Sequence, residues 1–461
     1  MKSVAGILLL AILQGCGPTR LSPDLNQIYG AAARQSHVDR NPIIVIPGIL
    51  GSRLVDESLG KVAWGAFGKG AVRLDSPEGM RSLALPFSQQ GWPKDEIRPD
   101  GVLSQLRVSF GYDFRFKAYS GMLAAFGLGG YLDPELTEPG ALDYGSEHFT
   151  CFQFAYDWRR SCAENAALLG NFIEEKRRYV AKERKRPYGS DAPVRFDLVA
   201  HSMGGLVARY HLMYGGRPLA RDGNMPVDWS GSRHVEKLIV VGTPNGGSVY
   251  PVKDLQNGFQ LAPLLPRMPA AVIASMPSVY ELLPPGPDQA LTDESGAAFD
   301  YYDVAEWDRR GWGMLAPAQD ETLAVLLPDI QDAAGRRREA VAQVEKLLHN
   351  ARAFHRAINR PGRPPEGLEI HAFAGDAMWT ASRARILADG GVEFTGWTPG
   401  DGSVTRASVL RDLRTPGEAA RRLHGPIPWE HAHFVFSDHV KMTSDPAFVD
   451  NVLHLLLEKP R

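Results

Sequence analysis

The chain has 461 residues, of which 44% are hydrophobic and 23% are charged, and its formal net charge is −2. This is the composition of a globular protein with ample apolar material for a large core, and the near-neutral charge gives no reason to expect a nucleic acid as a partner. Length alone suggests about three domains, but α/β folds often absorb such length as insertions into one core.

The N-terminus has the pattern of an export signal. Lys2 precedes a short apolar stretch, residues 4–13, and the tetrapeptide Leu13-Gln14-Gly15-Cys16 follows. The stretch is too short to span a membrane as a mature helix, and the tetrapeptide resembles the end of a bacterial lipoprotein signal, which is cleaved before a cysteine that becomes lipidated. We therefore expect a signal peptide at residues 1–15, a lipidated Cys16 and a linker at residues 16–40. A free Cys16 after an ordinary signal peptide is the alternative.

The expected location is the bacterial cell envelope, because several acyl chains on one cysteine would anchor a soluble protein firmly. The residue after Cys16 is Gly17 and not an aspartate. By resemblance to lipoproteins of bacteria with two membranes, this favours the outer membrane, with the protein facing the periplasm or the cell surface.

The two remaining cysteines, Cys151 and Cys162, are predicted at the start of a strand and the start of the next helix. The extended residues between them would hold them about 20 Å or more apart, so no disulfide is expected. No cysteine and histidine cluster has the spacing of a zinc site, and we expect neither a metal nor a cofactor.

The first predicted core strand lies within residues 42–47, where Ile-Ile-Val-Ile forms a continuous apolar run typical of buried parallel strands. It breaks into Pro47-Gly48-Ile49-Leu50-Gly51-Ser52. A glycine-flanked turn of this kind leaves backbone N–H groups without partners above the sheet, as an oxyanion hole requires. We predict the N–H of Ile49 as one donor; a simple strand-ending turn is the alternative.

Residues 53–149 lack sustained strand alternation and contain many Gly, Pro and Trp residues, which indicates an insertion that covers the edge of the sheet. The glycine cluster at residues 127–130 has no following phosphate-loop lysine, so we expect it to be a flexible loop. A strand at residues 152–156 and a helix at about 165–182 return the chain to the core in one right-handed βαβ step.

Residues 195–207 are predicted to form a strand, a sharp turn and the start of a helix. The turn, Ala200-His201-Ser202-Met203-Gly204, differs from the usual G-x-S-x-G nucleophile turn by alanine at its first position, and alanine is still small. Ser202 is therefore the predicted nucleophile, and the N–H of Met203 is the second predicted oxyanion donor. A serine that only caps the helix is the alternative. We expect His201 to have a packing role beside the turn.

The rest of the chain continues the same architecture. A second insertion, rich in proline and amphipathic helix, spans about 249–365, so that residues 41–461 form one α/β domain with two insertions. The further elements predicted are a buried strand, a long amphipathic helix, another strand, a hairpin turn with the strand after it, and a C-terminal helix, at residues 235–241, 336–358, 368–374, 389–394 and about 446–457.

A serine hydroxyl needs an imidazole to take its proton and a carboxylate to orient that imidazole. In α/β-hydrolase folds these groups follow the serine in the order acid, then histidine. Asp401, in a glycine-flanked loop after a strand, is the predicted acid, and Asp376 is its rival. His439, just ahead of the last helix, is the predicted base, and its rivals are His431 and His433.

Six motifs occur in order over roughly residues 42–455, and together they resemble the lecithin:cholesterol acyltransferase family, which includes lysosomal phospholipase A2 and phospholipid:diacylglycerol acyltransferases. Each motif alone is weak, whereas their joint occurrence is specific. The motifs are Ile46-Pro47-Gly48-Ile49-Leu50-Gly51-Ser52, Tyr156-Asp157-Trp158-Arg159, Ala200-His201-Ser202-Met203-Gly204-Gly205, Gly242-Thr243-Pro244-Asn245-Gly246-Gly247-Ser248, Met276-Pro277-Ser278-Val279-Tyr280-Glu281-Leu282-Leu283-Pro284 and Gly400-Asp401-Gly402-Ser403-Val404.

The resemblance implies an α/β-hydrolase fold, with a mostly parallel central sheet and large lid and cap insertions. It implies a triad of Ser202, Asp401 and His439, and an oxyanion hole from the backbone of Ile49 and Met203. Trp64 resembles a tryptophan of the family's lid region. Its role could be a contact with the substrate or simple packing, and the sequence leaves both open. The family's lid disulfide has no counterpart, because no cysteine lies between residues 17 and 150.

Members of that family attack an acyl ester of a lipid, form an acyl-serine, and pass the acyl group to an alcohol or to water. We therefore expect a hydrolase or O-acyltransferase whose partners are a phospholipid acyl donor, an alcohol or water acceptor, and the membrane. A carboxylesterase or depolymerase-like esterase on non-lipid esters is one alternative. An inactive hydrolase fold that serves as an anchored binding module is another.

Overall fold

The structure is a computed structural model, and it describes residues 23–34, 40–88, 91–103, 105–109, 113–117, 119–135, 149–188, 191–262, 265–286, 290–414 and 423–458. The predicted signal peptide and Cys16 lie outside the described residues. None of the helices in the described ranges is both long and apolar enough to cross a membrane.

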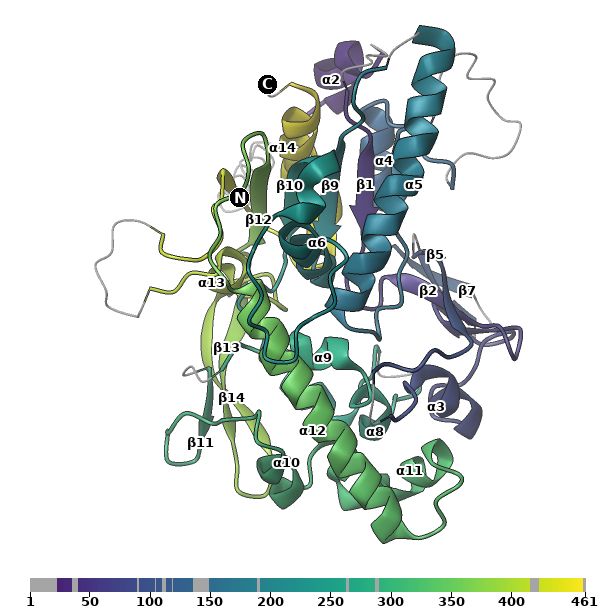
Figure 1. The fold of residues 1–461 in the computed structure, drawn as a ribbon, viewed down its shortest axis with the longest axis vertical. Helices are drawn as coiled ribbons and strands as arrows, with labels where there is room; N and C mark the ends of the chain where they lie inside the picture. The colour runs from purple at the N-terminus through teal and green to yellow at the C-terminus, as the bar shows by residue number, and fades with distance from the viewer. Residues whose placement is uncertain are drawn as a thin grey trace, which may run out of the picture.

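A parallel sheet of six strands forms the centre of the molecule (Figure 1). Neighbouring strands pair in parallel throughout, as in the register of Ile46 opposite Ala200. In spatial order the strands are β15 (His431–Val435), β12 (Glu369–Gly375), β10 (Val235–Val241), β9 (Phe196–His201), β1 (Ile43–Ile46) and β8 (Cys151–Gln153).

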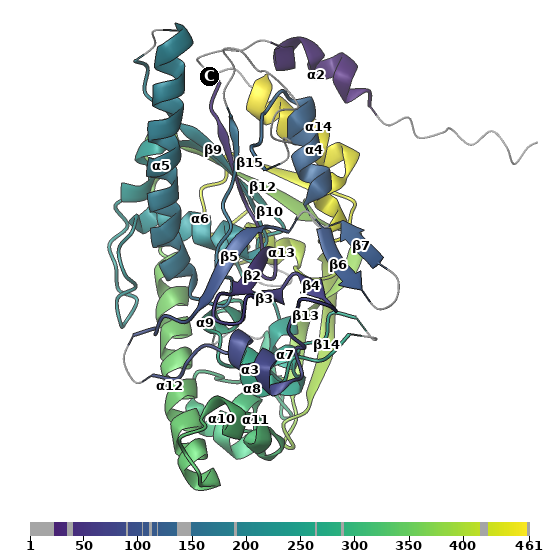
Figure 2. The same ribbon diagram turned by 90° about the vertical axis from the view of Figure 1, so that its right-hand side faces the viewer.

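Helices cover both faces of this sheet (Figure 2). α5 (Cys162–Tyr188) and α6 (Met203–Tyr214) pack on one face, and α4 (Ser120–Leu128) and α14 (Pro446–Leu457) pack on the other. Burial from both sides explains why the central strands are continuous apolar runs rather than alternating ones. This is the α/β-hydrolase fold that the motifs predict.

The first insertion contains short strands, although its sequence lacks sustained strand alternation. β3 (Lys61–Trp64), β2 (Ser52–Asp56) and β5 (Ile97–Val102) form one small sheet, and β4 (Ala66–Phe67), β6 (Gln105–Ser109) and β7 (Asp113–Lys117) form another, with α3 (Pro77–Leu83) nearby. These strands are short and their pairing has register shifts, so no long alternation marks them in the sequence.

The prediction of a flexible loop at residues 127–130 is wrong. α4 extends to Leu128, and the next two residues end the helix, with Gly130 at φ 78°. A Cβ on Gly130 would lie 2.3 Å from the backbone oxygen of Ala33, so this glycine permits a close contact between two segments.

The second insertion is mainly helical and lies below the sheet in Figure 1. The late hairpin leaves the central sheet and pairs instead with a short strand of this insertion. The elements are α7 (Tyr250–Asn257), α8 (Ala270–Ile273), α9 (Pro277–Glu281), β11 (Leu291–Asp293), α10 (Val304–Arg310), α11 (Asp320–Leu326), α12 (Ala333–Ile358), β13 (Met378–Ile386) and β14 (Val392–Gly400), followed by α13 (Arg406–Leu410).

A helix also forms inside the segment predicted as a linker. α2 (Leu25–Arg34) lies beside α14, and the buried Tyr29 donates a hydrogen bond from its hydroxyl to the carboxylate of Asp450, at 2.7 Å. α2 is therefore docked on the domain.

Candidate active site

Ser202 lies at the sharp turn between β9 and α6, with φ 52° and ψ −127°. Its N–H donates to the oxygen of Val241 on the neighbouring strand, at 2.8 Å. The turn needs small residues because the neighbouring backbone passes very close to it. A Cβ on Gly204 would lie 2.4 Å from the oxygen of Pro47, and the fully buried Ala200 fits between the adjacent strands. The predicted strand, turn and helix are present.

Three side chains from distant parts of the chain meet at this turn. The Nε2 of His439 lies 3.0 Å from the Ser202 hydroxyl, and its Nδ1 lies 2.7 Å from an oxygen of the Asp401 carboxylate. A carboxylate only accepts, so Nδ1 carries the proton and Nε2 is free to accept from the serine. The arrangement has the connectivity of a catalytic triad, in which the imidazole removes the proton of the nucleophile.

The loop after β14 holds Asp401 in this orientation. Its second carboxylate oxygen accepts from the N–H groups of Ser403 and Val404, at 2.9 and 2.7 Å. Its backbone oxygen accepts from the N–H of His439, at 2.9 Å. Because Asp401 is 1% exposed, these bonds fix a buried carboxylate against the imidazole.

The rival residues lie elsewhere. Asp376 pairs with Arg406 at 3.3 Å. His431 and His433 are on β15, where His433 stacks on Phe373 with ring centroids 4.6 Å apart. In the described part of the chain, none of the three rivals has a hydrogen bond to Ser202 or His439.

The turn after β1 approaches the nucleophile closely enough to supply an oxyanion hole. A Cβ on Gly48 would lie 2.7 Å from the Cβ of Ser202, so only glycine allows this approach. Leu50, next to Ile49, has φ 63°, which bends the turn back over the sheet. Within the described ranges, the N–H groups of Ile49 and Met203 have no hydrogen-bond partner in the protein. They are available to a substrate oxygen.

A chain of buried hydrogen bonds connects this turn to the base. The N–H of Gly48 donates to the hydroxyl of Tyr119 at 2.8 Å, and that hydroxyl lies 2.8 Å from the Nδ1 of His201. The Nε2 of His201 lies 3.0 Å from the backbone oxygen of His439. Since the Tyr119 oxygen accepts from Gly48, its O–H donates to Nδ1, and Nε2–H donates to His439.

His201 therefore does more than the predicted packing. Burial lowers its pKa to about 3, with a smaller contribution from the neighbouring His439, so the neutral imidazole persists at neutral pH. Tyr119 is a functional candidate that the sequence does not reveal, because its partners lie 71 and 82 residues away along the chain.

A mostly apolar cavity of about 510 Å³ opens above Ser202. One carboxylate lines it, Asp254 on α7, and burial raises the pKa of that carboxyl to about 6. The apolar wall includes Ile49, Trp64, Leu103, Tyr250, Leu261 and Leu282. Such a wall suits acyl chains better than polar substrates.

Trp64 both lines the cavity and packs in the core, so its predicted substrate contact stays a prediction. It lines the cavity, but it is 1% exposed, and its indole N–H donates to the oxygen of Leu50 at 2.8 Å. Its ring packs edge-on against Trp158, with centroids 5.5 Å apart. Trp64 thus supports the turn that carries Ile49 and forms part of the cavity wall.

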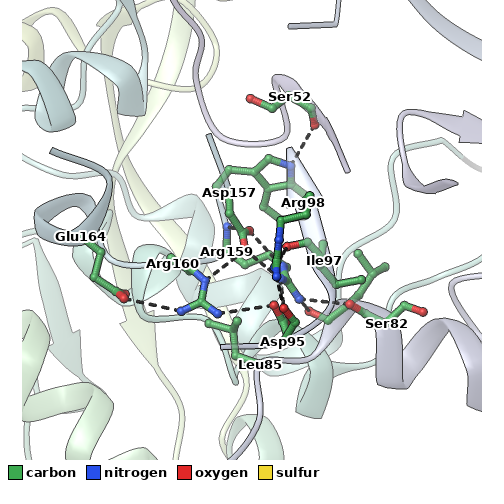
Figure 3. A network of polar contacts seen from close by, with 12 residues as sticks. Ser52, Ser82, Leu85, Asp95, Ile97, Arg98, Asp157, Arg159, Arg160 and Glu164 are labelled. Carbon is green, nitrogen blue, oxygen red and sulfur yellow. Dashed lines mark hydrogen bonds and ion pairs between the residues drawn. The ribbon is translucent and has the colours of Figure 1, made fainter. Parts of the chain in front are cut away.

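A buried ion network fastens the first insertion to the core (Figure 3). The fully buried Arg159 donates to both oxygens of Asp157, at 2.9 and 2.7 Å, and to Asp95 at 2.8 Å. Another of its N–H groups donates to the backbone oxygen of Ser82, at 3.0 Å. Because Ser82 and Asp95 belong to the insertion, the motif around Arg159 holds the insertion beside the cavity.

Comparisons with known proteins found one family model and several solved structures that are similar to this chain. The family model described as Lecithin:cholesterol acyltransferase matches residues 143–308, which confirms the predicted resemblance over that part of the chain. The crystal structure of the Tle4–Tli4 complex contains a chain with a TM-score of 0.55 and 15% identity, covering 92% of this chain and 100% of that one; at this identity the likeness concerns the fold alone. The mature Bacillus licheniformis lipase BlEst2 has a TM-score of 0.35 and 13% identity, covering 92% of this chain and 94% of that one. No curated protein sequence matches.

Proposed function

Because residues 143–308 match the lecithin:cholesterol acyltransferase family and a connected triad lies beneath an apolar cavity, we propose that this protein is a serine-dependent acyl-ester hydrolase or O-acyltransferase that acts on lipids. The observation that carries the proposal is the position of His439, 3.0 Å from the Ser202 hydroxyl and 2.7 Å from the Asp401 carboxylate. A phospholipid acyl chain is the substrate favoured by the family match and the apolar wall.

In the proposed first half-reaction, the Nε2 of His439 takes the proton of Ser202 while the serine oxygen attacks the ester carbonyl carbon. The N–H groups of Ile49 and Met203 hold the oxygen that becomes negative; removing one such donor typically costs about 10²- to 10³-fold in kcat. The tetrahedral intermediate then expels the alcohol part of the lipid, which takes the proton from His439. An acyl-serine remains.

In the second half-reaction, an acceptor hydroxyl gives its proton to His439 and attacks the carbonyl carbon of the acyl-serine. The bond from that carbon to the Ser202 oxygen then breaks, and the serine oxygen takes the proton back from His439. Water yields a free acid, and an alcohol yields a transferred ester. Asp401 stays ionised throughout and stabilises the imidazolium. The balance between the two products depends on how well the occupied cavity excludes water.

A fluorophosphonate probe tests the nucleophile. We expect the folded wild type to be labelled and the Ser202→Ala variant to remain unlabelled; a folded wild type that takes up no label would refute the proposal. Mass analysis of products from a defined phospholipid, with and without a sterol or diacylglycerol acceptor, then distinguishes hydrolysis from transfer. Turnover of short soluble esters with no turnover of phospholipid would favour the carboxylesterase alternative.

We also propose that Cys16 carries the lipid anchor and that the protein resides at the bacterial envelope. The support is the signal pattern that ends at Cys16. Growth with an alkyne fatty acid, followed by tagging, should label the wild type and leave Cys16→Ser unlabelled. Labelling that persists in Cys16→Ser would reject this site.

A further inference from the structure

Several large apolar side chains are exposed beside the triad. Trp379 and Phe436 are 72% and 75% exposed, and four further residues are also exposed. Clusters of this kind are uncommon on soluble monomers and mark interaction sites. The six residues, called the apolar rim below, are Met378, Trp379, Trp397, Phe434, Phe436 and Val440.

The loops after β12 and β15 lie side by side. The N–H of Asp376 donates to the backbone oxygen of Val435, at 3.2 Å. Arg406 pairs with Asp376, and its guanidinium lies 3.4 Å from the ring centroid of Phe434. The exposed residues that follow each of these strands therefore belong to one surface.

The hairpin of β13 and β14 begins at Met378, two residues after Asp376, and exposes further apolar side chains. Trp379 is opposite Pro399 in the hairpin register, and Trp397 precedes Pro399 by two residues, so the three residues share one exposed face. Met378 is opposite Gly400, the residue just before Asp401. The apolar rim thus borders the loop that holds the triad carboxylate.

The rim is continuous with the mouth of the cavity. Val440, which follows His439, is 50% exposed and also lines the cavity. Leu261, in the second insertion, is 38% exposed and also lines the cavity. Whatever rests on the rim therefore rests at the entrance used by the substrate.

Four charged side chains beside the rim form two ion pairs. Asp376 pairs with Arg406 at 3.3 Å, and Asp438 pairs with Lys441 at 2.8 Å. An occupant is therefore held mainly by apolar contact. A second copy of the chain, or another protein, would close the cavity by covering Val440, whereas a lipid surface would present an acyl ester to it.

We propose that the apolar rim docks on the surface of a phospholipid bilayer, with Trp379 and Phe436 inserted at the boundary between headgroups and acyl chains. Aromatic side chains favour this boundary, and burial of apolar area drives the insertion. The inference rests on the proposed function, because the choice of a lipid surface assumes a lipid substrate.

Vesicle co-sedimentation tests the docking. The full chain carries Cys16→Ser, which removes any lipid anchor, and Ser202→Ala, which prevents turnover. We expect this protein to bind phosphatidylcholine vesicles, and we expect Trp379→Ser with Phe436→Ser to weaken the binding by about tenfold or more. The control is Leu59→Ser with Leu168→Ser, which removes exposed leucines outside the rim and leaves binding unchanged.

Each other outcome overturns the docking proposal. These outcomes are no binding before the rim is changed, equal binding after it is changed, and binding confined to anionic vesicles that is lost in high salt. A dimer in solution that dissociates when Trp379 and Phe436 are replaced would make a second copy the occupant. Hydrolysis of a short soluble ester by Cys16→Ser tests the proposed function separately: vesicle binding without hydrolysis would refute the function and leave the docking intact.

Discussion

The imidazole of His201 donates to the backbone oxygen of His439, with 3.0 Å between Nε2 and that oxygen. His201, next to the proposed nucleophile Ser202 on the chain, thus holds the backbone of the proposed base. Through Tyr119 the same imidazole is connected to Gly48, beside the oxyanion turn. Three segments that the proposed mechanism needs to align share one chain of hydrogen bonds.

Removal of one hydroxyl should test this chain. Tyr119→Phe leaves the Gly48 N–H and the His201 Nδ1 without their partner, so we expect kcat on a short soluble ester to fall by about tenfold, with a smaller change in KM. The matched control is Tyr250→Phe, because Tyr250 also lines the cavity and its hydroxyl accepts from a backbone N–H, that of Ala381. An equal loss of kcat in both variants would contradict a specific role for Tyr119.

The identity of the acid can be tested against its rival. Asp401→Asn removes the acceptor that fixes the tautomer of His439, so kcat should fall by about 10³- to 10⁴-fold. Asp376→Asn removes only a pairing with Arg406 and should change kcat by less than about threefold. Circular dichroism checks that both variants fold. A larger loss in the Asp376 variant would reassign the acid.

The ion network of Figure 3 predicts a large effect on stability. Arg159→Ala leaves Asp157 and Asp95 without their main partner in the interior, which should cost about 3 to 5 kcal/mol in the free energy of unfolding. Arg160→Ala, whose ion pairs with the same carboxylates are longer at 3.3 and 3.4 Å, should cost about 1 kcal/mol. Urea unfolding measures both, and equal losses would show that the network adds nothing beyond surface ion pairs.

Asp254 predicts a stability difference that depends on pH. Its pKa is raised to about 6 in the folded protein, mainly by burial, whereas the unfolded chain titrates near the ordinary value. Below the ordinary value both states are protonated and nothing is lost. Between the ordinary value and about 6 the unfolded chain is ionised while the folded carboxyl stays protonated, so the free energy of unfolding falls across this window and stays level above it. The free energy of unfolding of Asp254→Asn should therefore equal that of the wild type near pH 4 and exceed it by on the order of 1 kcal/mol at pH 8. Thermal unfolding at the two pH values checks this, and a gain confined to pH 4 would contradict it.

The local parts of the site are predictable from the sequence. The turn at Ser202 lies between an apolar strand and a helix, and its small residues follow from the close passage of Pro47. The loop of Asp401 is also predictable from local sequence, because a glycine-flanked aspartate comes directly after a strand. These sequence signals lie within a few residues of Ser202 and Asp401 themselves, so they can be found in a single sequence.

The remaining parts depend on contacts between distant segments. β15 escapes prediction because it is an edge strand in which only Val435 is buried and His431 is exposed. Because the sequence pattern does not reveal this strand, His431 and His433 remain rivals of His439. The role of Tyr119 depends on a position in an insertion with no regular pattern. Tertiary packing, rather than local propensity, decides both.

The hydrogen bond from Tyr29 to Asp450 has a consequence for how an anchored molecule would move. With a lipid on Cys16, only eight residues, 17–24, would separate the anchor from α2, and a segment of that length spans about 30 Å at most. The folded domain would then stay within reach of the leaflet in which it is rooted. If it acts on lipids as proposed, that leaflet would supply its acyl donors, and lipids of the facing membrane would lie beyond the tether.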